Sequence, residues 1–208
     1  MNIWFATNNS HKKKELEAIL GTVLKIPSEA GIAFDPEETG ASFCENALIK
    51  ARELKKLLRS NDNLVIADDS GLCVDSLDGR PGVFSARYGE TDGKKLTSLQ
   101  KNLLLLEELG DTKKRNARFV CAMVLLMEND RFFIVQETLE GEIVEDRGLL
   151  RGDGGFGYDP VFIPCDEHAN VEHAPLERTL AEFSDEEKNL ISHRGKAGKY
   201  IASILKNF

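Results

Sequence analysis

The sequence has few cysteines and no long hydrophobic run, and both absences narrow the class of protein. Only four of the 208 residues are cysteine, and no two of them form a C-x-x-C pair. This spacing argues against a disulfide framework or a cysteine zinc site and suits a reducing compartment with buried thiols. No signal peptide and no membrane-spanning apolar stretch is visible. We therefore expect a soluble, cytoplasmic protein with no membrane partner.

Positive charge is also in short supply. The chain has 27 Lys and Arg residues against 35 Asp and Glu residues, which gives a formal net charge of −8. Such a charge does not favour binding to nucleic acid, so we expect no nucleic-acid partner. A polyanionic substrate would need a local cluster of cations or a bound metal ion. The ordinary composition, without repeats or low-complexity segments, predicts a single domain over residues 1–208, with two lobes as a variant.

The chain is organised around an apolar run that leads into two carboxylates. Residues 64–67 predict a buried strand, and Asp68, Asp69 and Ser70 follow it directly. Ligands usually bind at the carboxyl end of such a strand. Because neighbouring side chains on a strand point to opposite faces, Asp68 and Asp69 cannot do the same job. The alternative is an Asx-turn that only ends the strand.

The N-terminal region is predicted to be a strand, a polar turn and a helix. Residues 1–6 are apolar, the turn covers residues 7–12, and a helical apolar stripe then ends at Gly21. The N-terminus of a helix offers free N–H groups to a phosphate. The same turn can equally be an ordinary helix cap beside solvated lysines. Residues 24–34 then predict a further strand and a loop.

A second helix begins at a capping box made by Ser42 and Glu45. Lys50 falls on the inward side of this helix, where it either extends to solvent or reaches a polar cleft. Glu37 and Glu38, just before the helix, are the best candidates for a carboxylate that joins Asp69 on a metal ion.

The second half of the chain predicts a hairpin and a glycine-rich loop. Residues 117–127 and 131–139 form the hairpin, and a further strand is expected to begin at residue 141. The glycine-rich loop, residues 152–160, precedes a strand rather than a helix, so it is not a dinucleotide fingerprint. Its glycines allow a close approach of the backbone and its aromatic rings can stack, so we expect it to bind a flat base. After another capping box, residues 192–195 interrupt the C-terminal helices, either as a cap or as a cluster of hydrogen-bond donors.

Several short motifs occur in one order along the whole chain. They are Thr7-Asn8-Asn9, Lys12, Glu38-Thr39-Gly40, Glu45-Asn46-Ala47, Lys50-Ala51, Ala67-Asp68-Asp69-Ser70-Gly71-Leu72, Pro81-Gly82, Ser85-Ala86-Arg87-Tyr88, Gly154-Gly155-Phe156-Gly157-Tyr158-Asp159-Pro160 and Ser192-His193-Arg194-Gly195. In this order the sequence resembles the inosine triphosphate pyrophosphatase family. It departs from that family in two places. Asn8 stands where glycine is more usual, and the connection of residues 165–179 is longer and contains His168 and His173, which we interpret as a solvated loop.

The resemblance implies a fold and an activity. The fold is a mixed α/β structure, with an elongated central β-sheet flanked by helices and two lobes around a deep nucleotide-binding cleft. The family is usually homodimeric. The implied activity is hydrolysis of non-standard purine nucleoside triphosphates (ITP, dITP and XTP) to the monophosphate and pyrophosphate, with Mg²⁺ as the cofactor.

The resemblance also assigns roles to residues. Asp69 orients or deprotonates the attacking water, Asp68 supports the metal or its partner, and Lys50 joins the phosphate site. Glu38 and Asp69 are the predicted Mg²⁺ ligands. The predicted substrate-binding residues are Thr7, Asn8, Asn9, Ser10, His11, Lys12, Ser70, Phe156, Gly157, Tyr158, Asp159, Lys188, His193 and Arg194.

Base choice is expected to follow hydrogen-bond polarity. His193 as imidazolium and Arg194 offer only donors, which pair with the 6-carbonyl of inosine and xanthosine but not with the 6-amine of adenine. Two alternatives stay open. One is a Maf-like pyrophosphatase with pyrimidine or modified substrates, which residues 156–159 and 192–194 disfavour. The other is a nucleotide sensor without catalysis, which would not need Asp69, Glu38 and Lys50 together.

Overall fold

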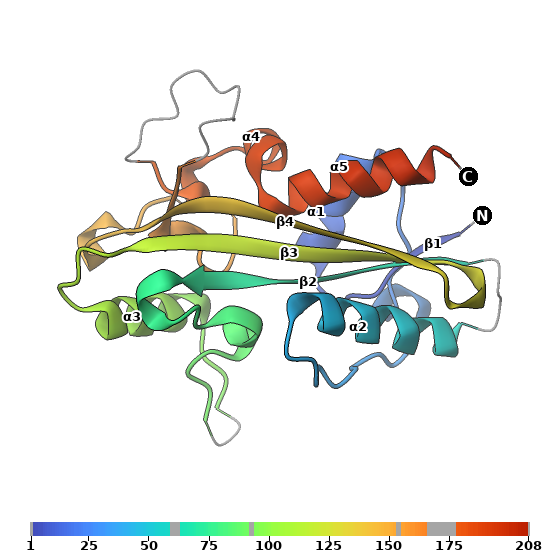
Figure 1. The fold of residues 1–208 in the computed structure, drawn as a ribbon, viewed down its shortest axis with the longest axis horizontal. Helices are drawn as coiled ribbons and strands as arrows, with labels where there is room; N and C mark the ends of the chain where they lie inside the picture. The colour runs from blue at the N-terminus through green and yellow to red at the C-terminus, as the bar shows by residue number, and fades with distance from the viewer. Residues whose placement is uncertain (1, 59–62, 92–93, 153–154, 166–177, 208) are drawn as a thin grey trace. The chain divides into compact units, whose positions relative to one another are not determined.

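The chain divides into two compact units in a computed structural model (Figure 1). The structure describes all residues except 1, 59–62, 92–93, 153–154, 166–177 and 208. Unit 1 consists of residues 1–70, 121–137 and 193–208, and unit 2 of residues 71–120 and 138–192. The predicted cleft between two lobes stays a prediction.

One mixed sheet runs in the order β1-β2-β3-β4-β5. The strands are β1 (Ile3–Phe5), β2 (Leu64–Val74), β3 (Asn116–Leu126), β4 (Phe132–Ile143) and β5 (Phe162–Pro164). The first two strands are parallel, with Trp4 opposite Val65, whereas β4 and β5 are antiparallel, with Glu142 opposite Ile163. The predicted mixed α/β class with helices around a central sheet is confirmed.

The helices begin and end at local signals that the sequence displays. They are α1 (Ser10–Leu20), α2 (Phe43–Leu57), α3 (Ser98–Leu109), α4 (Asp185–Ile191) and α5 (His193–Leu205). Asn9 caps α1, which ends at Gly21 with φ 64°. The predicted capping box of Ser42 and Glu45 opens α2, and α3 ends at Gly110. The predicted end of α1 at Gly21 and the predicted start of α2 are confirmed, because caps depend on residues that are close in sequence. Helix α1 begins at Ser10, inside the turn predicted over residues 7–12.

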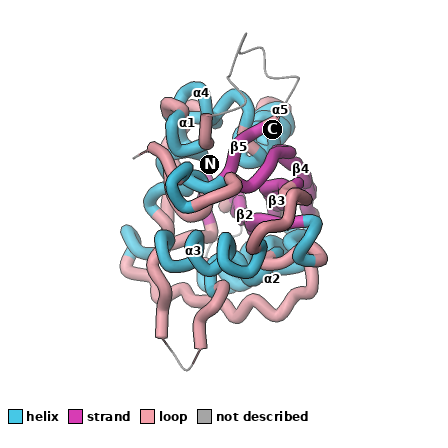
Figure 2. Tube along the Cα trace, turned by 90° about the vertical axis from the view of Figure 1, so that its left-hand side faces the viewer, coloured by secondary structure: helices cyan, strands magenta, loops and turns pink. Residues whose placement is uncertain are grey.

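In unit 1, helices cover both sides of the strands. Helices α1 and α5 lie on one side and α2 lies on the other (Figures 1 and 2). The core between α1, α5 and the strands contains Phe5, Leu16, Ile66, Met123 and Ile201, all fully or almost fully buried. This packing fixes the start of α5 next to the middle of β2, which becomes important for the candidate site.

Unit 2 has its own core around α3, β5 and the nearby strand segments. Leu105 of α3 and Leu180 are fully buried there. The rings of Phe119 and Phe162 stack at a tilt with centroids 4.7 Å apart. The core therefore anchors β5, which follows directly on the glycine-rich loop.

Four other predictions about element boundaries were wrong. Strand β2 does not end before Asp68 but continues to Val74. Residues 141–143 complete β4 instead of beginning a new strand. Residues 24–34 contain a bridge from Lys25 to Trp4 and the 3₁₀ helix Ser28–Ala30 instead of a strand. His193 begins α5 rather than lying in a break. The first error has a clear cause: cations from distant segments compensate both buried carboxylates, so the strand continues through them.

The structure contains no disulfide among the four cysteines, as the sequence predicted. Cys44, Cys73, Cys121 and Cys165 are all free. Burial raises the pKa of the Cys121 thiol to about 12, which makes it unreactive. Among the residues that the structure describes, no helix has both the length and the apolarity that crossing a membrane requires.

Candidate active site

The two neighbouring aspartates lie within β2 and are almost completely buried. Asp68 is 1 % exposed and Asp69 is 6 % exposed. Side chains at consecutive strand positions point to opposite faces of the sheet. Each carboxylate therefore meets a different set of partners, as the sequence predicted. An ionised carboxylate is buried only with compensating charges, so these partners define the chemistry of the site.

Asp68 is held by two cations and a hydroxyl. Its Oδ1 accepts a hydrogen bond from Lys12 Nζ at 3.0 Å. Its Oδ2 accepts from Arg194 Nη2 at 3.0 Å and from Ser70 Oγ at 3.3 Å. Burial opposes ionisation, but Lys12, Arg194 and Lys50 outweigh it and hold the pKa of Asp68 well below its ordinary value. Asp68 is therefore a permanent anion that organises the cations around it.

Arg194 comes from the first turn of α5 and is 2 % exposed. Besides Asp68, its guanidinium donates to Glu15 Oε2 at 2.6 Å and to Ser70 Oγ at 2.8 Å. Burial alone would lower its pKa, but Asp68 and Glu15 raise it further above the ordinary range. The guanidinium is thus engaged inside unit 1, and the base-reading role expected of Arg194 stays a prediction.

The turn before α1 is largely occupied by its own structure. Asn9 Oδ1 accepts from the backbone N–H groups of His11 and Lys12, and Thr7 Oγ1 accepts from Asn9 N. Asn8 Nδ2 donates to Phe34 O at 2.7 Å. The side chains of Thr7 and Asn9 hence shape the turn. Lys12 lies in the first turn of α1 and binds Asp68. Burial and the charges of Arg194 and Lys50 lower the pKa of Lys12, although Asp68 opposes them.

Asp69 belongs to a second cluster, centred on Lys50 of α2. Lys50 Nζ lies 2.7 Å from Asp69 Oδ1 and 2.8 Å from Glu38 Oε1. The inward position predicted for Lys50 is confirmed: it is 8 % exposed. Burial raises the pKa of Asp69 despite the opposing effect of Lys50. Glu38 and Asp69 thus converge on one point that already holds a positive charge.

These contacts decide whether a divalent cation fits. The two clusters together contain four carboxylates, Glu15, Glu38, Asp68 and Asp69, and three cations, Lys12, Lys50 and Arg194. Among the described residues, no group of three or more metal-ligating side chains occurs. Two converging hard oxygen donors nevertheless suit Mg²⁺, which usually takes its other ligands from water and substrate phosphates. Glu38 and Asp69 fit such an ion.

Unit 2 contains the predicted base-binding residues. Lys188 of α4 and Asp159 form an ion pair of 2.9 Å, and both are less than 5 % exposed. Asp159 Oδ2 also accepts from Phe156 N at 2.7 Å, while Lys188 Nζ lies 4.9 Å from the centre of the Phe156 ring. Gly155 has φ 69°, and a Cβ there would lie 2.1 Å from Asp159 Oδ2. The pair therefore requires this glycine.

Two further hydrogen bonds hold the same loop. Asn102 of α3 donates from Nδ2 to Gly157 O at 3.1 Å. Tyr158 donates its hydroxyl to Ser85 O at 2.9 Å, and Ser85 Oγ in turn accepts from Leu72 N. The loop is thus tied to α3 and to β2, and these bonds hold the backbone next to Phe156.

The structure divides the predicted site residues into two sets. Unit 1 holds Thr7, Asn8, Asn9, Ser10, His11, Lys12, Glu38, Lys50, Asp68, Asp69, Ser70, His193 and Arg194, and unit 2 holds Phe156, Gly157, Tyr158, Asp159 and Lys188. Sequence reasoning missed Glu15, Asn46 and Asn102. Asn46 and Asn102 are polar residues on buried helix faces, and this is the signal that could have found them.

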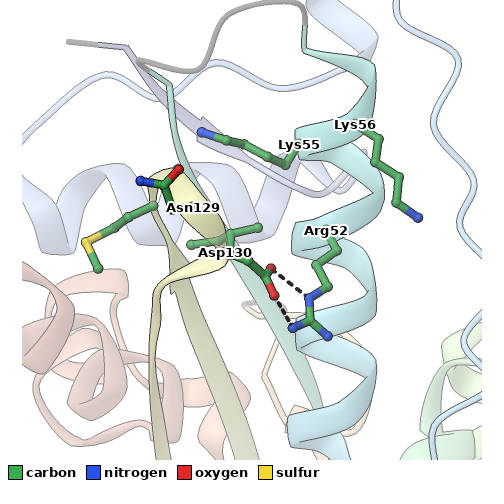
Figure 3. A pocket seen from close by; sticks show the side chains of 7 residues that line it. Arg52, Lys55, Lys56, Asn129 and Asp130 are labelled. Atoms are coloured by element: carbon green, nitrogen blue, oxygen red, sulfur yellow. Dashed lines mark hydrogen bonds and ion pairs between the residues drawn. The ribbon is translucent and has the colours of Figure 1, made fainter.

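A separate pocket of about 300 Å³ lies in unit 1 (Figure 3). Its lining residues are Arg52, Lys55, Lys56, Leu126, Met127, Asn129 and Asp130. Arg52 binds Asp130 through two parallel hydrogen bonds, and Lys56 pairs with Glu53. None of the predicted site residues lines this pocket, so it does not belong to the candidate active site.

The comparisons with known proteins give the family of the chain. A sequence profile of the Ham1 family matches residues 3–204. The chain belongs to the Ham1 family. A relative from Treponema denticola, named dITP/XTP pyrophosphatase, is 45% identical over 207 residues and covers 99% of both chains. Another of the same name, from Bacillus subtilis, is 39% identical and covers 96% of this chain and 94% of its own. The family predicted from the ordered motifs is confirmed.

Solved structures of Ham1 proteins share the fold. A Ham1 protein from Coxiella burnetii has a TM-score of 0.82 at 36% identity and covers all of both chains. A Ham1 protein from Staphylococcus aureus has a TM-score of 0.80 at 35% identity, with 100% of this chain and 99% of that chain covered. The similarity extends over the whole chain, so both units belong to the Ham1 fold.

Proposed function

We propose that this protein hydrolyses non-standard purine nucleoside triphosphates, namely ITP, dITP and XTP, to the monophosphate and pyrophosphate. The observation that carries this proposal is the convergence of Glu38 and Asp69 on Lys50. A buried carboxylate, a half-buried one and an ammonium at one point suit phosphoric anhydride hydrolysis, where phosphate charge must be neutralised and a water activated. The names of the relatives supply the substrate class.

The reaction assigns distinct tasks to the residues of unit 1. A water oxygen attacks the α-phosphorus, the bond from that phosphorus to the oxygen shared with the β-phosphorus breaks, and pyrophosphate leaves. Asp69 orients the water and accepts its proton. Lys50, which is buried beside Asp69, and Lys12, which is half-buried beside Asp68, neutralise phosphate oxygens. Asp68 acts through Lys12 and Arg194, the two cations that it binds.

Mg²⁺ is part of the proposal because of the charge count. The carboxylates of the two clusters outnumber the cations by one, so a triphosphate would meet net negative charge. Glu38 and Asp69 would hold the ion, and when bound it would neutralise charge on the phosphates.

Unit 2 supplies the recognition of the base in this proposal. Phe156 offers a ring for stacking, and the buried pair of Asp159 and Lys188 fixes that ring and presents polar atoms beside it. His193 and Arg194 retain their predicted role at the 6-carbonyl.

We also propose that the protein acts in the cytoplasm, where the nucleotide pool is found, and as a homodimer.

Pyrophosphate release in H₂¹⁸O tests both the substrate and the bond that is cleaved. With Mg²⁺, we expect ITP, dITP and XTP to be cleaved roughly a hundredfold more efficiently than ATP, the scale of two unmatched hydrogen bonds at position 6 of the base. GTP shares the 6-carbonyl, so its slower cleavage must come from its 2-amino group. Attack at the α-phosphorus places ¹⁸O in the monophosphate. Equal cleavage of ATP and ITP, or ¹⁸O in the pyrophosphate, would contradict the proposal.

A further inference from the structure

Asn46 is a polar residue in a place where a helix usually carries an apolar one. It lies in the first turns of α2 and is 0 % exposed, next to the buried Ala47. A buried amide destabilises a protein unless its donors and acceptor find partners. Neither the helix cap nor the hydrophobic core requires an amide there. The contacts of this side chain therefore indicate what it does.

Both ends of the amide are engaged. Gly40 N donates to Asn46 Oδ1 at 2.8 Å, and Asn46 Nδ2 faces Asp69 Oδ2 at 3.3 Å. The backbone N–H of Gly40 can only donate, and the carboxylate of Asp69 can only accept. These two partners fix the orientation of the amide without ambiguity.

The amide works together with Lys50, which follows four residues later on the same face of α2. Lys50 binds Asp69 Oδ1 and Glu38 Oε1, whereas Asn46 binds Asp69 Oδ2 and Gly40, two residues after Glu38. Both oxygens of Asp69 are thus held by one helix. The same helix holds the segment that carries Glu38.

The backbone at Gly40 is shaped around this contact. A Cβ at position 40 would lie 2.7 Å from Asn46 Oδ1 and 2.7 Å from Glu45 Cβ. The next two N–H groups, those of Ala41 and Ser42, both donate to Glu45 Oε2. The segment after Glu38 is therefore fastened to the start of α2 at three successive backbone positions.

We propose that Asn46 is a positioning residue that makes Glu38 and Asp69 converge before the substrate binds. It orients the carboxylate plane of Asp69 and fixes the segment that carries Glu38. This inference rests on the proposed function, since it assigns Asn46 a task in that reaction. It does not make Asn46 a ligand of the substrate.

Three variants separate the two contacts. Asn46→Leu keeps the approximate shape and removes both. Asn46→Asp keeps the acceptor for Gly40 N but places a second carboxylate against Asp69, which either repels Asp69 or shares a proton with it. Gly40→Ala keeps the asparagine at position 46, but the added Cβ pushes its Oδ1 away from the backbone N–H of residue 40. Each should lower kcat for ITP roughly ten- to a hundredfold, because displacements of about 1 Å in a catalytic group have such effects. KM should stay within about twofold of the wild-type value.

Amide hydrogen exchange of Gly40, followed by NMR, gives a readout that needs no activity. Exchange should accelerate in Asn46→Leu and stay slow in Asn46→Asp, although both lose turnover. Asn102→Asp is the matched control, since it also replaces a buried helical asparagine, and it should leave the exchange of Gly40 unchanged.

The outcomes distinguish this inference from the proposed function. Wild-type turnover in a folded Asn46→Asp protein, or unchanged Gly40 exchange in Asn46→Leu, would overturn the positioning role. If the wild-type protein cleaves no purine triphosphate, the proposed function fails instead, while the exchange data still report whether Asn46 holds the Gly40 segment. Should Asn46→Leu fail to fold, Asn46→Asp and Gly40→Ala decide the question.

Discussion

The candidate residues of unit 1 and those of unit 2 are built on different principles. In unit 1, buried ion pairs connect residues as distant in sequence as Glu15 and Arg194. In unit 2, the buried ion pair of Asp159 and Lys188 lies beside the ring of Phe156, and Asp159 also accepts a backbone hydrogen bond from Phe156 N. The first arrangement concentrates charge, and the second fixes the shape of a loop. Under the proposed function, concentrated charge suits the recognition of phosphates, and a loop of fixed shape suits the recognition of a base.

The comparison also shows where rigidity comes from. The charged side chains of unit 1 form ion pairs with one another, so loss of one partner leaves an uncompensated buried charge, which is destabilising. The unit 2 loop is held by contacts with α3 and α4, so loss of one side chain leaves the rest of the loop in place. We therefore expect substitutions in unit 1 to affect turnover and stability, and substitutions in unit 2 to affect mainly substrate affinity.

The largest expected effect is that of chelation. EDTA should reduce pyrophosphate release from ITP to background, and added Mg²⁺ should restore it. Without the ion, the phosphates of ITP would meet the net negative charge of the two clusters. Binding of inosine monophosphate, measured by calorimetry, should persist in EDTA within a few fold, since it depends on unit 2. Activity that survives chelation would remove Mg²⁺ from the proposed site.

Asp69→Asn should have the next largest effect. The variant keeps the shape of the side chain and removes its charge, so turnover of ITP should fall at least about a hundredfold while the protein stays folded. Steady-state kinetics and circular dichroism check the two parts. Asp130→Asn is the matched control, since Asp130 also pairs with a cation, Arg52, but is exposed. Near-normal turnover in Asp69→Asn would end its assignment as the base.

Arg194→Ala should affect stability as well as catalysis. It leaves Asp68 and Glu15 without their shared cation, and loss of one partner from a buried pair costs about 3–5 kcal/mol of the free energy of unfolding, measured by urea denaturation. Kinetics then separate two roles. A fall for ITP far greater than that for ATP supports base reading, whereas equal falls mean that Arg194 acts only through Asp68.

The smallest effect is expected in unit 2. Phe156→Ala removes the proposed stacking surface, which is worth about 1–3 kcal/mol per base, so KM for ITP should rise roughly tenfold with little change in kcat. Phe132→Ala is the matched control, because Phe132 also lies beneath a cation, Arg52, but belongs to unit 1. A loss of kcat without a change in KM would contradict the division of labour between the two units.

Much of the local structure follows from the sequence. The caps at Asn9, Gly21 and Ser42 and the start of β5 after the glycine-rich loop all depend on residues a few positions apart. The order of the motifs identified the family, and the residue types at Glu38 and Asp69 suggested a metal. The sequence also predicted the inward position of Lys50, since helix periodicity places it on the buried side.

The tertiary structure alone decided which partner each charge has. Asp68 meets Lys12 across 56 positions and Arg194 across 126 positions, and no local pattern encodes such pairs. For the same reason the sequence wrongly ended β2 at the aspartates, since two adjacent carboxylates favour a turn unless distant cations compensate them. Asn46 was missed because a polar residue on a buried helix face has a meaning only when its partners are known. Local hydrogen bonds set the elements, whereas long-range electrostatics set the site.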